Sequence, residues 1–188
     1  MDTSDDVQRH LLQCLKQISY ILGGCRRIFV LYLDSALAME NAALERLQRR
    51  VQQTILEEAK QKLQHHLGET KEQQERLRQL ITKEGRTPTQ EKGKLPISIP
   101  PESIRKAIKT PLVLAEQELL ESVEDTIIEN AEVIGYNFLV QMAVKMNRGD
   151  ALVLLKQSFE EEERMSEWLK TNAPVMFAKL WSQIDSLR

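Results

Sequence analysis

Apolar residues recur at steps of three and four along most of the chain, which is the spacing that lines one face of a helix. Four long stretches show this pattern and are predicted to form helices: residues 26–52, 55–83, 111–146 and 150–170. Helices of this number and length predict an all-α four-helix bundle.

Shorter helices are expected on either side of the four long ones. Residues 5–22 form a helical stretch that is expected to stop at Gly23-Gly24, because adjacent glycines are costly inside a helix and common at its end. Another short helix is expected at residues 174–186, where a proline follows the fourth long stretch.

Residues 85–101 interrupt the pattern, with glycines and prolines set among polar residues. A connection of this length between the second and third long helices can cross the whole bundle, which is the ferritin-like topology. A short helix at 101–109 is expected to follow the crossover. The chain is therefore predicted to consist of an N-terminal helical extension, 1–24, and a ferritin-like bundle, 25–188.

Composition and charge narrow the classes of function. The chain has 188 residues and a formal net charge of −2, which argues against nucleic acid as a partner. The local basic group Arg46, Arg49 and Arg50 is expected on a solvated helix face. No apolar run approaches the ~20 residues of a membrane span, and the acidic N-terminus does not resemble a secretory signal. A cytoplasmic protein without a membrane partner is expected.

Each long helix places a polar side chain where its spacing favours an apolar one. These residues are Glu40 in the first helix, His66, Thr70 and Gln73 in the second, Glu132 in the third and Glu162 in the fourth. Glu132 borders a predicted apolar sector that includes Val123, Ile134 and Phe138. Carboxylates that converge in a core must share protons, pair with a cation or bind a metal, and iron or manganese is the usual metal of carboxylate bundles.

Three separated segments resemble a known family. They are ETKEQQERL at 69–77, ENAEVIGY at 129–136 and LKQSFEEE at 155–162. They resemble the YciE/YciF family of ferritin-like bacterial stress proteins, and the resemblance extends over about residues 26–170. It implies a rubrerythrin-like bundle that forms a homodimer, in a family associated with stress responses.

The candidate site matches the ferritin-like dimetal pattern only in part. That pattern takes one Glu from each of two helices and a Glu-x-x-His from each of the other two. Met165 stands where the motif on the fourth helix needs histidine, and the second helix reads Thr70 to Gln73 at the corresponding spacing. The candidate metal ligands are therefore Glu40, Glu69, Glu132, Glu162 and His66.

Three functions remain open at this point. The first hypothesis is a stress-associated protein with a degenerate carboxylate site and no metal, whose polar core layer serves a structural or interaction role. Its rival is a metal-binding protein or oxidoreductase that uses iron or manganese. The third is a helical adaptor that binds a partner's helix, which would require an exposed apolar groove. The sequence contains no Ser-His-Asp or Cys-His arrangement and no phosphate-binding loop, which excludes the common hydrolases and kinases. It leaves open whether the protein is an enzyme, and it identifies no protein partner beyond a second copy.

Overall fold

Four long helices make up nearly all of the described structure. The computed structural model describes residues 3–94 and 112–186, and no strand occurs in these ranges. The helices are α1 (Thr3–Gln53), α2 (Glu57–Lys83), α4 (Leu114–Lys145) and α5 (Gly149–Asp185). The all-α prediction is confirmed. The short helix expected at 101–109 lies outside the described residues.

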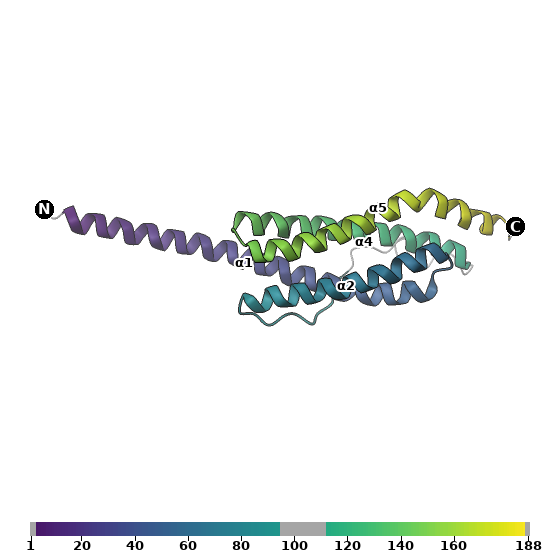
Figure 1. The fold of residues 1–188 in the computed structure, drawn as a ribbon, viewed down its shortest axis with the longest axis horizontal. Helices are drawn as coiled ribbons and strands as arrows, with labels where there is room; N and C mark the ends of the chain where they lie inside the picture. The colour runs from purple at the N-terminus through teal and green to yellow at the C-terminus, as the bar shows by residue number, and fades with distance from the viewer. Residues whose placement is uncertain (1–2, 95–111, 187–188) are drawn as a thin grey trace.

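The helices form a bundle in which each packs against two others. α1 lies against α2 and α4, and α5 lies against α4 and α2. In Figure 1, α1 and α5 run in one direction, whereas α2 and α4 run in the opposite direction. Because α2 and α4 are parallel, α4 begins at the opposite end of the bundle from the end of α2, as the predicted ferritin-like topology requires.

α1 is a single helix of 51 residues, so the predicted break at Gly23-Gly24 is wrong. Two glycines cost about 1 kcal/mol each in a helix, but a helix already formed on both sides gains a hydrogen bond with every residue it adds. The first part of α1 extends beyond the other three helices, while its remainder belongs to the bundle (Figure 1).

α5 also continues where a break was predicted. Pro174 lies inside this helix, so the helices predicted at 150–170 and 174–186 are one element. Leu169 and Leu180 are buried on either side of the proline, and their packing offsets the lost backbone hydrogen bond. α5 changes direction in its C-terminal part (Figure 1), as proline commonly causes.

The buried face of α2 matches its predicted periodicity. The polar residues predicted on this face, His66, Thr70 and Gln73, are buried, and so are the apolar residues spaced along the same face: Leu56, Ala59, Leu63, Leu77 and Leu80. Apolar clusters occupy both ends of this face, one around Leu77 and Leu80 and another around Leu63. The polar middle of α2 therefore lies between two apolar parts of the core.

The buried face of α4 differs from the predicted one. Val123, Ile134 and Phe138, which were assigned to the apolar sector, are each about half exposed. The residues that α4 buries include Glu118, Glu124, Asp125, Glu129 and Glu132. α4 is thus turned so that carboxylates face the bundle, which requires cations or other partners on the opposing helices.

Two arginines of α1 supply part of the positive charge that the buried carboxylates of α4 need. They were expected on a solvated helix face. Arg46 and Arg50 are instead 8% and 2% exposed. Arg50 donates to Glu118 at 2.8 Å and to Asp125 at 2.8 Å, and Arg46 contacts the same Asp125 at 2.8 Å. Only Arg49 of this group is exposed as predicted. The arginine–carboxylate network joins α1 to α4 toward the C-terminal end of α1.

None of the helices in the described part of the chain combines the length and apolar character needed to cross a membrane.

Candidate metal centre

Acidic side chains and a histidine from all four helices meet in the middle of the bundle. All of these side chains are buried, with 4% of their surface exposed or less. We call this group the core acid cluster: Glu40 of α1, His66 of α2, Glu129 and Glu132 of α4, and Glu162 of α5. The core acid cluster lies between two apolar clusters, one around Leu77 and Leu80 and the other around Leu63, because the buried face of α2 is polar only in its middle.

His66 occupies a central place in the cluster. Its Nε2 lies 3.0 Å from Glu129 Oε2 and 3.6 Å from Glu162 Oε2. One ligand atom from each of these three residues lies within 4.8 Å of the other two. That separation is short enough for one cation to contact all three atoms.

The other ring nitrogen of His66, Nδ1, forms a hydrogen bond outside the cluster. Nδ1 donates a hydrogen bond of 3.0 Å to Glu69, and Arg164 donates to the same carboxylate at 3.2 Å. Burial opposes ionisation of Glu69, yet His66 and Arg164 lower its pKa to about 2. Glu69 therefore serves as an ionised acceptor that fixes the ring of His66, an arrangement typical of metal-ligating histidines.

The environment of His66 also favours a positive charge at Nε2. Burial lowers the pKa of the imidazole, but Glu129, Glu69 and Glu162 outweigh burial and hold it well above its usual range. A proton and a metal ion would therefore compete for the same nitrogen.

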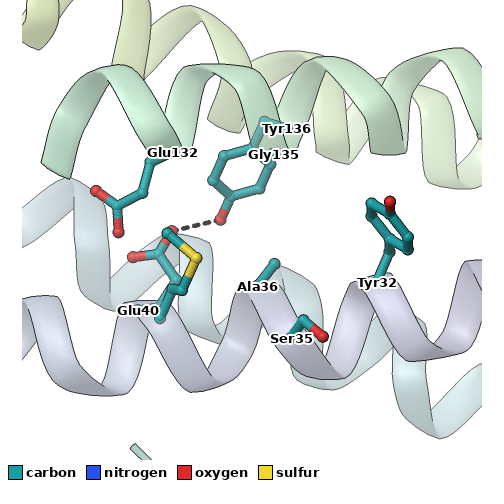
Figure 2. Close-up of a pocket in the computed structure, with 8 residues that line it drawn as sticks. Tyr32, Ser35, Ala36, Glu40, Glu132, Gly135 and Tyr136 are labelled. Atoms are coloured by element: carbon teal, nitrogen blue, oxygen red, sulfur yellow. Dashed lines mark hydrogen bonds between the residues drawn. The ribbon is translucent and has the colours of Figure 1, made fainter. Parts of the chain in front are cut away.

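Glu40 accepts a hydrogen bond of 2.6 Å from the hydroxyl group of Tyr136, so α4 and α1 are joined beside the cluster (Figure 2). Complete burial is the main cause that raises the pKa of Glu40, to about 7, although Tyr136 and His66 act in the opposite direction. Tyr136 is thus a buried hydrogen-bond donor to the cluster.

Several oxygens of the cluster have no hydrogen-bond partner. Among the described residues, Glu132 Oε1 and Glu162 Oε2 of the cluster, together with Oε1 of the adjoining Gln73, are buried and accept no hydrogen bond. Burial and neighbouring carboxylates raise the pKa values of Glu132 and Glu162 well above the usual range. Buried oxygens without a donor are costly, so the group favours a bound cation or retained protons.

Arg76 makes its hydrogen bonds outside the cluster. Arg76 donates to both oxygens of Glu161, at 2.7 and 2.8 Å, and to Ser158. Gln73 bridges Glu161 and Glu162 through its amide nitrogen, at 3.1 and 2.6 Å. The cluster therefore contains four carboxyl groups and one imidazole. Tyr136 and Gln73, which donate hydrogen bonds to it from outside, are neutral, and the raised pKa of His66 makes its imidazole the positive charge within the cluster.

The structure brings together four of the five candidate ligands named from the sequence. Glu40, His66, Glu132 and Glu162 belong to the cluster, whereas Glu69 lies behind His66. Glu129 was not singled out as a ligand. Its spacing could have identified it, because it lies seven residues before the buried Tyr136, one full heptad along the same face.

The donor set fits a divalent transition metal. One imidazole nitrogen and several carboxylate oxygens suit iron or manganese, whereas zinc and copper sites use more nitrogen or sulfur. The missing histidine on α5 is replaced by the buried, apolar Met165. The cluster can therefore provide one metal ion with one histidine ligand and several carboxylate ligands. It has no second imidazole for a second metal ion.

The arrangement of the four helices and their carboxylate-lined interior define a protein of the ferritin-like class. A family model described as "Domain of unknown function (DUF892)" matches residues 25–180. The chain belongs to this family. No curated protein matches it.

Three solved structures have a similar fold. The protein XCC3681 from Xanthomonas campestris pv. campestris is 16% identical with a TM-score of 0.71, over 86% of this chain and 99% of that one. The E. coli stress protein YciF is 21% identical with a TM-score of 0.67, over 82% and 98% of the two chains. YcfI of Rhodopseudomonas palustris, described as "a putative structural protein", is 21% identical with a TM-score of 0.67, over 78% and 93%. The predicted resemblance to the YciE/YciF family is confirmed.

Proposed function

We propose that the core acid cluster binds a divalent transition metal, iron or manganese, with His66, Glu129 and Glu162 as its principal ligands. The observation that carries this proposal is the convergence of these three ligand atoms within 4.8 Å, in a core where carboxylate oxygens lack hydrogen-bond donors. A divalent cation supplies two positive charges, where the protein itself offers the four carboxyl groups only the single imidazole of His66.

The orientation of His66 gives independent support. Its Nδ1 is engaged by Glu69, so Nε2 is directed toward the carboxylates of Glu129 and Glu162. Glu132 and Glu40 lie beside this trio and are available to a metal or to its water ligands. Bound iron or manganese would supply redox chemistry toward oxygen or peroxide, while the protein contributes the ligands and a nearly dry environment.

Metal reconstitution tests the proposal. Chelator-treated protein is loaded with Mn²⁺, or with Fe²⁺ under anaerobic conditions, and the metal content is measured by elemental analysis after desalting. We expect close to one ion per chain in the wild type and a large loss in His66→Gln and Glu162→Gln. Glu69→Gln should lower affinity about 10–100-fold, because it removes the carboxylate that orients the ring.

The matched control is Glu163→Gln, which neutralises an exposed carboxylate on the same helix, next to Glu162. It should bind metal like the wild type. Metal content well below one per chain in the wild type, or content that His66→Gln leaves unchanged, would show that this cluster is not a metal site.

A second candidate function is favoured by the hydrogen bonds that cross the cluster. Tyr136 joins α4 to Glu40 of α1, and Gln73 joins α2 to Glu162 of α5. In this alternative the carboxyl groups keep their protons, and the polar layer fixes how the helices pair within a structural or interaction protein. Replacement of Glu132 and Glu162 by Gln would then preserve the fold and the function, and no metal would bind.

The family comparisons also support a proposal for the role of this protein in the cell. We propose a stress-associated role because the chain belongs to the family and the similar YciF is a stress protein. The homodimer expected from the resemblance remains a prediction, which light scattering coupled to size-exclusion chromatography would test.

A further inference from the structure

A pocket between α1 and α4 leads from the surface to the core acid cluster. Its volume is about 140 Å³, and its surface is almost wholly apolar. Tyr32 and Ser35 of α1 are exposed at one end, whereas Glu40, Glu132 and Tyr136 are buried at the other (Figure 2).

Small residues form the middle of the pocket. Ala36 lines it from α1 and Gly135 from α4. A Cβ atom added to Gly135 would meet no heavy atom within 4 Å, so the space beside this glycine is open. An aromatic pair stands near the outer end, where the rings of Tyr32 and Phe138 meet edge to face with centroids 6.3 Å apart.

The size and lining of the pocket define the occupant. An apolar cavity of about 150 Å³ in another protein holds one benzene molecule and excludes water. Here the inner end differs, because Glu132 lines it and its Oε1 accepts no hydrogen bond from the described residues. An occupant with one hydroxyl group would satisfy that oxygen, whereas an anion would face several carboxyl groups.

We propose that this pocket binds a small neutral compound with an apolar body and a single hydroxyl group, which donates a hydrogen bond to Glu132. The body lies against Ala36, Met39 and Gly135, and Tyr32 borders the entrance. This inference goes beyond the proposed metal site and does not depend on a bound metal, although the two sites share Glu132.

Phenol, anisole and benzoate are suitable probes, used with the full-length protein after chelator treatment. Ligand-observed NMR and calorimetry measure their binding. We expect phenol to bind about tenfold more tightly than anisole, because anisole has no donor and leaves the buried Oε1 of Glu132 without a hydrogen bond. Benzoate should not bind measurably. Equal affinities of phenol and anisole, or no binding of phenol, would overturn the proposal.

Gly135→Leu locates the binding site, because its side chain would fill the pocket. Phenol affinity should fall at least tenfold, while Gly24→Leu, an exposed helical glycine of α1 far from the pocket, should leave it unchanged. A second variant, Ala36→Leu, narrows the pocket from the opposite helix in case Gly135→Leu does not fold. Phenol binding that survives in the folded variants would place it elsewhere and refute the proposal.

Manganese content, measured in the same variants, shows whether a loss of phenol binding is distinct from a failure of the proposed metal site. Both pocket variants should retain the metal content of the wild type, because neither replaces a proposed ligand. Loss of phenol binding together with normal metal content shows that the pocket can be blocked without disturbing the proposed metal ligands.

Discussion

The buried carboxyl group of Glu40 makes the metal-free protein less stable as the pH rises. Its pKa is about 7 in the folded protein, against 4.5 for an ordinary glutamate. The folded state therefore holds a proton that the unfolded state releases between these two values. Unfolding becomes more favourable as pH increases through this window, and the penalty is complete above about pH 7.

The magnitude follows from the two pKa values. The difference between about 7 and 4.5, at about 1.4 kcal/mol for each pH unit, gives about 3 kcal/mol at pH 8. Glu40→Gln should remove this penalty, since an amide does not ionise and its oxygen can still accept the hydrogen bond from Tyr136. We expect the variant to match the wild type near pH 5 and to be more stable by up to about 3 kcal/mol at pH 8.

Two other groups shape the wild-type profile. His66 has a raised pKa, so its stabilisation is also lost as pH rises above its usual value. Glu69 has a pKa lowered to about 2, so its stabilisation is present above pH 4.5 and lost below that value. Stability of the metal-free protein should therefore be highest near pH 5 and decline toward pH 8.

Urea denaturation followed by circular dichroism, at pH 5, 6, 7 and 8 with chelator present, measures this effect. Glu163→Gln is the control, because it removes an exposed carboxylate and should follow the wild type at every pH. A difference between Glu40→Gln and wild type that stays constant from pH 5 to 8 would refute the reasoning.

Three further predictions test packing around the cluster. Arg50→Ala should cost about 3–5 kcal/mol in chemical denaturation, because it leaves the buried Glu118 without a cation and Asp125 with Arg46 alone, while the exposed Arg49→Ala should change stability by less than about 0.5 kcal/mol. Tyr136→Phe should cost about 1–3 kcal/mol at pH 8, measured in the same way, because Glu40 loses its donor. Gly93→Val should free the segment that follows α2 and speed its cleavage by trypsin, because a Cβ there would lie 3.2 Å from a backbone oxygen of α1.

Some parts of the fold could be predicted because they depend on local spacing. The polar interruption of α2 at His66, Thr70 and Gln73 is visible in the chain, since the flanking Leu63 and Leu77 fix which face is buried. Continuous helices across Gly23-Gly24 and Pro174 could not be predicted in this way. Local propensity favours a break at each of these points, but helix propagation in α1 and packing around the proline in α5 favour continuity.

The rotation of α4 about its axis could not be predicted from the sequence. This helix has apolar residues on several sides, and the sequence alone assigned Ile134 and Phe138 to its buried sector. The buried partners on α1 decide otherwise: Arg46 reaches Asp125, 79 residues away, and the acids of α4 face inward as a result. That rotation also directs Glu129 toward His66.

The sequence by itself determined that the protein is a helical bundle with acids and a histidine in its core, because periodicity records which face of each helix is buried. Only the tertiary structure decided which acids meet His66, which arginines are buried, and where a pocket opens between α1 and α4. These features depend on contacts between helices that are distant in the chain, and the spacing within one helix carries no information about them.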